Sequence, residues 1–218
     1  PAEHLYETIP RFHDTVKRFQ DFSEAVRKDV KNRAGQCREE IDFALAREAD
    51  CGVLMNQLQE GILPLRVTHN DTKLNNILFD ADTDQGLCII DLDTIMPGLA
   101  ANDFGDSIRF GASTAEEDEP DLSKVHFDIH LYELYVKGYL EMAREVLTPA
   151  EIDSLPWGAR LMTLECGMRF LADYLQGDVY FKTAYPEHNL VRARTQFRLV
   201  KEMEEQFDSM YEILRKYS

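Results

Sequence analysis

Eight residues from His69 to Asn76 combine acidic, basic and amide side chains in the order H-x-D-x-K-x-x-N. An apolar run at 87–90 follows this segment and ends at Asp91. Together these residues supply a carboxylate, a lysine and two oxygen ligands for a metal ion, which are the parts that a phosphoryl transfer needs. Such a transfer depends mainly on positioning and on charge neutralisation.

The spacing predicts a chemical role for each of four side chains. Asp71 can orient an acceptor hydroxyl and take its proton, and Lys73 can reach the transferring phosphate. The amide oxygen of Asn76 and the carboxylate of Asp91 can hold Mg²⁺, which needs few protein oxygens because phosphate and water complete its shell. The alternative is a polar loop before a hairpin, with Asp71 and Asn76 as turn formers. The complete eight-residue match and the strands after it favour the phosphotransfer site.

A second aspartate competes for the metal role. Asp103 begins an Asp-Phe-Gly triplet, but it follows residues 97–102, which include proline and glycine, and not an apolar strand. Asp91 has the strand and lies nearer to the loop. We therefore expect Asp103 to be structural, as an acceptor for backbone N–H groups or as a helix N-cap, and a second metal role is the less favoured alternative.

The rest of the chain is typical of helices around one small hairpin. Thr148, Pro149 and Glu151 together indicate a helix start with a capping box. The expected helices lie at 10–33, 37–60, 103–111, 123–146, 157–176 and 188–216, and the expected strands lie at 76–79 and 87–91. We expect one domain in three segments: two leading helices (1–64), the catalytic loop, hairpin and metal-binding segment (65–111), and a helical substrate-binding subdomain (112–218).

Charge and cysteine content restrict the class of protein. The formal net charge is −16, which argues against nucleic acid or an anionic membrane as the main partner. The cysteines are widely spaced without a C-x-x-C pair, and Cys88 lies in an expected buried strand. Reduced thiols and a cytoplasmic protein are therefore expected. No signal peptide or membrane-length apolar run is apparent. The acidic run at 116–121 is typical of a solvated loop.

The segment from His69 to Arg109 resembles the aminoglycoside phosphotransferase/choline kinase superfamily of small-molecule kinases. Five stretches resemble the N-acetylhexosamine 1-kinase family in particular: IPRFHDT at 9–15, HNDTK at 69–73, IDLDTIMPG at 90–98, DFGDSIR at 103–109 and RFLADYLQGDVYF at 169–181. The similarity extends over nearly all of the chain. It implies a mainly α fold with a small central β-hairpin, namely the C-terminal lobe of a protein-kinase-like fold.

The resemblance also implies an activity. That family phosphorylates the anomeric hydroxyl of N-acetylglucosamine or N-acetylgalactosamine with ATP and Mg²⁺, so a sugar and a nucleotide are the expected partners. Asp71 would be the base, and Asn76 and Asp91 would be the metal ligands. The positions that would contact the sugar are Phe110, Arg169 and Tyr180. The residues that would support the site are His69, Asp93, Asp103, Arg109 and Asp173.

Each expected sugar contact also has a structural alternative. The guanidinium of Arg169 can donate to sugar hydroxyls or to an acetamide carbonyl, or it can pair with Asp173 four residues later. The rings of Phe110 and Tyr180 can pack on a sugar face, or they can belong to the core.

No Gly-rich phosphate loop precedes the catalytic segment, and no strand carries a candidate nucleotide lysine. We therefore expect the N-terminal lobe that covers ATP to be absent from this chain, an apolar surface to be exposed in its place, and turnover to need that lobe or a partner chain. Two other functions stay open. One is a kinase for an amino alcohol or an aminoglycoside, with Asp173 and Asp178 holding the cation. The other is a non-catalytic module for binding or assembly.

Overall fold

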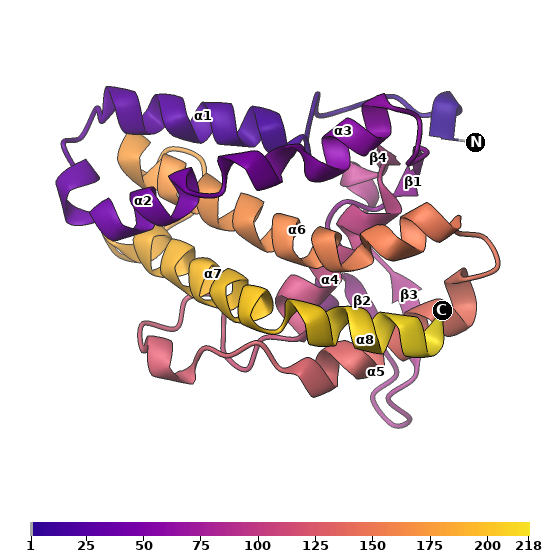
Figure 1. Cartoon of the computed structure of the whole chain (residues 1–218). Coiled ribbons are helices and arrows are strands. Elements are labelled where there is room, and N and C mark those ends of the chain that lie inside the picture. The colour runs from indigo at the N-terminus through magenta and orange to yellow at the C-terminus, as the bar shows by residue number, and fades with distance from the viewer. Residues whose placement is uncertain (1) are drawn as a thin grey trace.

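The computed structural model describes residues 2–218, which form helices joined by short strands and 3₁₀ turns (Figure 1). The α-helices are α1 (Thr15–Lys28), α2 (Arg38–Leu45), α3 (Val53–Gln59), α4 (Ala100–Gly111), α5 (Ile129–Ala143), α6 (Pro149–Gln176), α7 (His188–Glu205) and α8 (Phe207–Tyr217). The strands are β1 (Arg66–Thr68), β2 (Ile77–Phe79), β3 (Gly86–Ile89) and β4 (Met96–Gly98). The mainly α fold class with small hairpins is confirmed.

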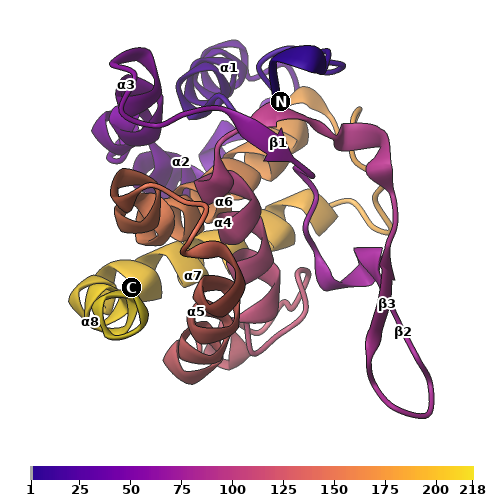
Figure 2. The same ribbon diagram turned by 90° about the vertical axis from the view of Figure 1, so that its right-hand side faces the viewer.

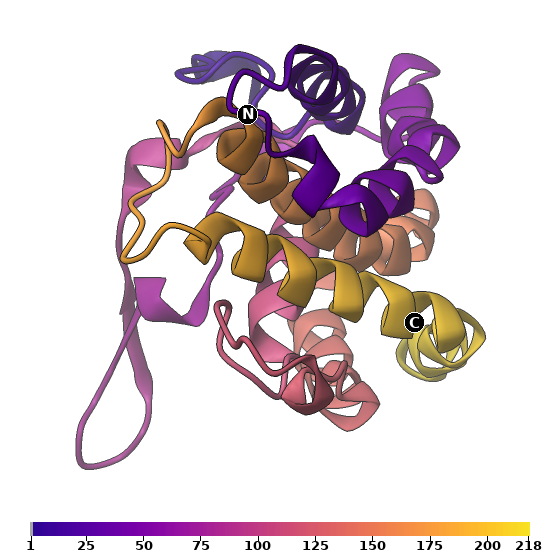
Figure 3. The ribbon, with the colours of Figure 1, turned by 90° about the vertical axis from the view of Figure 1, so that its left-hand side faces the viewer.

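Helix α6 forms the centre of the molecule, and α4, α7 and α1 pack against it most extensively (Figures 1 and 3). One hydrophobic cluster joins α6 to the leading helices and α7, and a second joins α4, α5 and α8. Gly105 of α4 and Gly158 of α6 lie at the crossing of these helices, where a Cβ on either glycine would overlap the other helix's backbone. The close crossing holds the acidic side chains of α4 near the middle of the fold.

The strands form two separate antiparallel pairs, β1 with β4 and β2 with β3. The β2–β3 hairpin extends away from the helices (Figure 2). Every residue of β3 is exposed, and Cys88 is an exposed free thiol. The prediction that Cys88 lies in a buried strand is therefore wrong, because the hairpin leaves the helical body. Other exposed apolar side chains accompany it, on β1, on the hairpin and on the residues next to them: Leu65, Val67, Leu74, Leu78, Phe79, Leu87, Ile89 and Leu92.

The leading helices are shorter than expected. Helix α1 begins only at Thr15, because the Asp14 side chain caps it by accepting a bond from Lys17 N. The single helix expected at 37–60 is wrong. The residues form α2, a 3₁₀ segment and α3. The Thr15 hydroxyl donates a hydrogen bond to the carbonyl of Cys51 within the 3₁₀ segment at 2.6 Å.

The later helices differ from expectation at their ends. Helix α5 begins at Ile129 rather than at 123, because Asp128 caps it with bonds from His130 N and Leu131 N. Helix α6 is continuous from its capping box onward, although Pro156 lies inside it. The expected last helix is divided into α7 and α8 at Gln206. Over residues 2–218, no helix has both the length and the apolar character needed to cross a bilayer.

Candidate active site

The loop between β1 and β2 carries the candidate base. Side chains of α4 hold this loop by accepting hydrogen bonds from the loop's backbone N–H groups. The carboxylate of Asp103 accepts hydrogen bonds from His69 N at 2.8 Å and from Asn70 N at 2.7 Å. One turn later in α4, Asp106 accepts a bond from Thr72 N at 2.8 Å. Burial raises the pKa of Asp103, although the two backbone N–H groups act to lower it. These bonds fix the path of the loop on both sides of the candidate base.

The Asp-Phe-Gly triplet of α4 is used for packing. Asp103 lies in the first turn and not at the N-cap, which is Leu99, and its two oxygens face the loop backbone. Phe104 is fully buried in the core, and Gly105 allows the close crossing with α6. All three residues of the triplet therefore make structural contacts.

Asp71 has one carboxylate oxygen held and one free. Its Oδ2 accepts bonds from Lys73 Nζ and from Asn76 Nδ2, both at 2.9 Å. The same Asn76 amide nitrogen also donates to the Asp71 carbonyl at 2.9 Å. Within residues 2–218, no hydrogen bond uses Oδ1, and the Asp71 side chain is 28% exposed. The free oxygen is available to an acceptor hydroxyl.

Asn76 and Asp91, the expected metal ligands, lie on two segments that are joined by a backbone hydrogen bond. The amide nitrogen of Asn76 faces Asp71, whose oxygens only accept, so the Asn76 Oδ1 is left as a free ligand. Ile90 N donates to Asn76 O at 2.9 Å, which brings Asp91 beside Asn76. Asp91 is exposed, and its backbone is left-handed with φ 61°. Within the described chain, no three His, Cys, Asp or Glu side chains form a metal cage, so Mg²⁺ here would rely on water and phosphate as well.

Two of the supporting residues lie beside these ligands. The Nε2 atom of His69 lies 3.0 Å from Ile90 O and must carry the proton, because a carbonyl only accepts. Its other ring nitrogen, Nδ1, is buried without a partner among the described residues. Asp93 is exposed, two residues after Asp91. The His69 contact ties the end of the hairpin to the catalytic loop.

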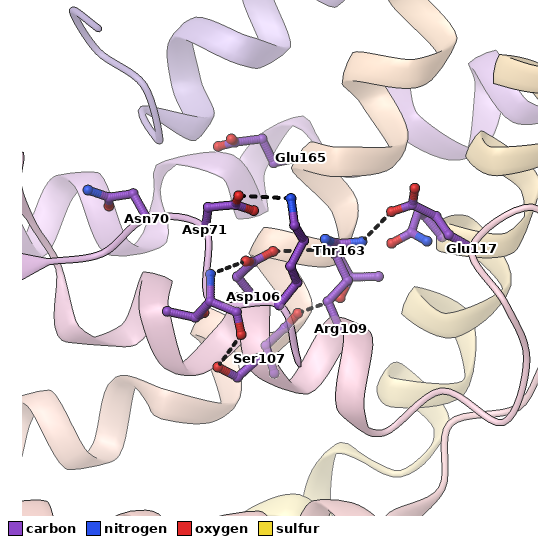
Figure 4. A network of polar contacts seen from close by, with 12 residues as sticks. Asn70, Asp71, Asp106, Ser107, Arg109, Glu117, Thr163 and Glu165 are labelled. Carbon is purple, nitrogen blue, oxygen red and sulfur yellow. Dashed lines mark hydrogen bonds and ion pairs between the residues drawn. The ribbon is translucent and has the colours of Figure 1, made fainter. Parts of the chain in front are cut away.

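A row of charged contacts leads from the loop into the helices (Figure 4). Asp106 pairs with Arg109 at 3.0 Å, and Arg109 pairs with Glu117 at 2.7 Å. The Arg109 side chain is only 8% exposed, so its charge is compensated by these two carboxylates. The acidic run is thus not a simple solvated loop, since Glu117 joins this row and Asp118 pairs with His188 at 2.9 Å.

The structure brings together two of the three expected sugar contacts. Arg169 and Tyr180 line one hollow of about 370 Å³. The Arg169 guanidinium lies 5.3, 6.0 and 5.5 Å from the ring centroids of Phe12, Tyr180 and Phe181, and it makes no hydrogen bond within residues 2–218. Phe110 is apart from them and lines a different hollow.

Asp173 does not pair with Arg169. Its buried carboxylate accepts the backbone N–H groups of Val179, Tyr180 and Phe181 at distances between 2.8 and 3.0 Å. The alternative of an Arg169–Asp173 ion pair is therefore wrong. Asp173 instead shapes the turn that carries Tyr180, and the donors of Arg169 stay free.

Sequence reasoning missed two tyrosines beside the catalytic loop. Tyr135 and Tyr139 of α5 line a hollow of about 420 Å³ together with Asp71 and Lys73. The two rings stack with their centroids 6.2 Å apart. Burial raises the pKa of both, to about 12 for Tyr139, which keeps the hydroxyls neutral. Their only signal in the sequence is a spacing of four residues, which is also common on packing faces.

Comparison with known proteins gives a family match and a similar fold. The model of the phosphotransferase enzyme family matches residues 2–142, which include the catalytic loop and both candidate metal ligands. The fold is similar to the crystal structure of choline kinase from Cryptosporidium parvum Iowa II, with a TM-score of 0.54 and 16% sequence identity. The match covers 97% of this chain and 63% of the choline kinase chain. At this identity the likeness shows the fold alone.

Proposed function

This chain belongs to the phosphotransferase enzyme family, and on that premise we propose that it transfers the γ-phosphoryl group of ATP to a hydroxyl of a small molecule. The proposed acceptor is the anomeric hydroxyl of an N-acetylhexosamine. The observation that carries the proposal is the state of Asp71, whose Oδ2 is held by Lys73 and Asn76 while its Oδ1 is free. A carboxylate oriented in this way is suited to act as a general base.

In the proposed reaction, Asp71 takes the proton of the acceptor hydroxyl. The hydroxyl oxygen attacks the γ-phosphorus, and the bond from that phosphorus to ADP breaks. Lys73, 2.9 Å from Asp71, supplies positive charge beside the transferring group. Asn76 and Asp91 would hold Mg²⁺, which when bound neutralises charge on the β- and γ-phosphates.

The free donors of Arg169 support a sugar acceptor. Within the described chain this guanidinium has aromatic rings around it and no carboxylate bonded to it, so its N–H groups can bind hydroxyls or an acetamide carbonyl. Tyr180 lines the same hollow and offers a ring face. The resemblance adds Phe110 as a third contact, although it lines a separate hollow.

An amino alcohol such as choline is the second candidate acceptor, and a different observation favours it. The hollow that contains Asp71 has the stacked rings of Tyr135 and Tyr139 in its wall. Aromatic faces attract quaternary ammonium groups. This candidate would place the acceptor against α5, whereas the sugar would lie against Arg169 of α6.

A calorimetric titration separates these acceptors. The chain is titrated with N-acetylglucosamine, N-acetylgalactosamine, choline and kanamycin, each with and without Mg-ATP, and phosphorylated product is measured in parallel. We expect an N-acetylhexosamine to bind, and to be phosphorylated when the ATP-covering lobe is supplied in the same chain or by a partner chain. Choline binding without sugar binding would support the second candidate. Binding of a ligand with no product under any condition would support the non-catalytic module, although the chain retains Asp71, Lys73, Asn76 and Asp91.

Matched variants locate the acceptor. Arg169→Ala is expected to weaken N-acetylhexosamine binding about 10-fold or more, because a hydrogen bond to a charged group contributes roughly 1.5–3 kcal/mol. Tyr139→Ala, which removes a ring from the other hollow, should leave sugar affinity unchanged. The reverse pattern would move the acceptor to the α5 side. Phe110→Ala tests whether the third hollow belongs to the sugar site.

A further inference from the structure

His13 connects a motif near the start of the chain to the catalytic loop. Its Nδ1 lies 2.8 Å from Glu165 Oε1 of α6, and its Nε2 lies 3.0 Å from the carbonyl oxygen of Asn70, the residue before the candidate base. The side chains are almost completely buried, with 7% of His13 and 1% of Glu165 exposed. In Figure 4, Glu165 extends from α6 near Asn70 and Asp71. A buried carboxylate is costly unless a partner compensates its charge, and His13 is the partner of Glu165 Oε1.

The two contacts determine where the protons of the His13 ring lie. A carbonyl oxygen only accepts, so Nε2 carries a proton and donates it to Asn70. Burial acts to lower the pKa of His13, but the charge and hydrogen bond of Glu165, with the bond to Asn70, outweigh it and raise that pKa. The second oxygen of Glu165, Oε2, is buried without a partner in the described residues. The hydrogen bonding of this carboxylate is therefore directed to His13 alone.

The backbone of Asn70 is held at both its N–H and its carbonyl, which belong to the two peptide bonds on either side of its Cα. Asp103 accepts a bond from its N–H, and His13 donates to its carbonyl. Asn70 has a left-handed backbone with φ 64°, an unfavourable conformation for a residue other than glycine. Its carbonyl belongs to the peptide bond that leads directly into Asp71. Rotation of this peptide would turn the Asp71 carboxylate away from its present position.

We propose that His13 and Glu165 form a positioning pair that holds the Asn70 carbonyl and thereby orients the Asp71 carboxylate for phosphoryl transfer. Glu165 orients the His13 ring, and the ring holds the peptide before the base. Neither side chain contacts the acceptor or the phosphate. The inference rests on the proposed role of Asp71. It also assigns a role to the IPRFHDT stretch at 9–15, which contains none of the four candidate site residues.

Kinetic analysis of His13→Ala and Glu165→Gln tests the pair. For His13→Ala, kcat should fall roughly 10- to 100-fold, since a small misplacement of a catalytic group has effects of this size. The KM values for acceptor and ATP should stay unchanged, because neither residue binds them. Added imidazole should restore part of the kcat of His13→Ala by refilling the ring site. Glu165→Gln, which keeps the volume, should lose several-fold in kcat with the same KM values.

The chain contains a matched control pair. His126 Nδ1 lies 3.0 Å from Glu202 Oε1, and the other Glu202 oxygen accepts Phe127 N at 2.7 Å. This pair contacts no residue of the catalytic loop in the described chain, and the His126 side chain is 49% exposed. His126→Ala should therefore keep kcat, KM and the loop at wild-type values.

Amide hydrogen exchange over residues 69–73 gives a readout that needs no turnover. Exchange should be faster in His13→Ala than in the wild type and in His126→Ala. Equal exchange rates in all three proteins would overturn the inference. So would a wild-type kcat in Glu165→Gln. A kcat loss in His13→Ala accompanied by raised KM values and no imidazole rescue would also overturn it. If His13→Ala fails to fold, Glu165→Gln decides by the same measures. If the wild type phosphorylates no acceptor even with the ATP-covering lobe supplied, the proposed function fails while the exchange comparison still tests the pair.

Discussion

The two halves of the candidate site are supported very differently. The base half, around Asp71, is fixed by three side chains from two segments, because Asp103 and Asp106 of α4 and His13 before α1 all bond to the loop backbone. The metal half follows the β2–β3 hairpin, in which every residue of β3 is exposed. Its Asp91 carboxylate is solvent-exposed, with no hydrogen bond or ion pair within residues 2–218.

This contrast separates two ways of building one site. The base half is preorganised by buried side chains, so its geometry exists before any ligand arrives. The metal half is tied to the loop by bonds from Ile90 N to Asn76 O and from the His69 ring to Ile90 O. Thr94, three residues after Asp91, adds a bond from its hydroxyl to His69 O and accepts one from the Asn70 amide. We infer that the metal half takes its final geometry from the metal and the nucleotide. Substitutions should therefore affect the two halves through different measurements.

The largest expected effect is that of Asp71→Asn. The amide keeps the shape and can still bond to Lys73 or Asn76, but it cannot take a proton from the acceptor. We expect kcat to fall about 100- to 10,000-fold, the usual contribution of a general base, with acceptor affinity nearly unchanged. Steady-state kinetics and calorimetry measure the two quantities. A near-normal kcat would remove Asp71 from the base role.

The second expected effect tests whether the base half depends on α4. Asp103→Ala leaves the N–H groups of His69 and Asn70 without their acceptor. The free energy of unfolding should fall by about 2 kcal/mol or more, since each buried unsatisfied group costs roughly 1–3 kcal/mol. Asp82→Ala, at an exposed position in the hairpin turn, is the control and should be neutral. Urea unfolding of both variants checks the difference, and equal stabilities would contradict the proposed support by α4.

Much of this architecture is readable in the sequence because it is encoded locally. The catalytic loop, the strands beside it and the capping box at Thr148 depend on residues a few positions apart. The mainly α fold class is confirmed on that basis. The roles of Asp71, Lys73, Asn76 and Asp91 stay predictions, although the structure bonds the side chains of Lys73 and Asn76 to Asp71 and places the Ile90 backbone, just before Asp91, against Asn76.

The parts that the sequence does not reveal depend on distant contacts. His13 and Glu165 are 152 positions apart, and no local pattern relates them. The exposed hairpin has the composition of a buried strand, since burial is decided by the elements that pack against it. The same limit applies to the helix expected at 37–60, which is divided where the Thr15 hydroxyl donates a hydrogen bond to the Cys51 carbonyl. Tertiary contacts override local propensity at each of these places.

A smaller effect should appear in the pH dependence of stability. The pKa of His13 is raised above its ordinary value of 6.5, with burial and Arg169 opposing the shift and Glu165 and the Asn70 carbonyl producing it. The folded chain therefore binds this proton more tightly than the unfolded chain. The resulting stabilisation is complete below about pH 6.5 and is lost as the pH rises through the raised folded pKa.

His13→Gln measures this pH-dependent stabilisation, because glutamine keeps a polar side chain but does not titrate. The wild type should exceed the variant in unfolding free energy by more at about pH 6 than at about pH 9, with about 1.4 kcal/mol for each unit by which the pKa is raised. Urea unfolding at the two pH values gives the difference. A pH-independent difference would mean that folding leaves the pKa of His13 unchanged, and a smaller advantage of the wild type at about pH 6 would mean that folding lowers that pKa.

The smallest expected effect belongs to the hairpin. Leu87 in β3 is 65% exposed, so Leu87→Ser should change the free energy of unfolding by no more than about 0.5 kcal/mol. The fully buried Leu164 of α6 provides the contrast, because Leu164→Ala should cost about 2–5 kcal/mol. Denaturant unfolding at several protein concentrations measures both. A loss above about 1 kcal/mol for Leu87→Ser that grows with concentration would show that another copy covers the hairpin, and the metal half would then be supported as firmly as the base half.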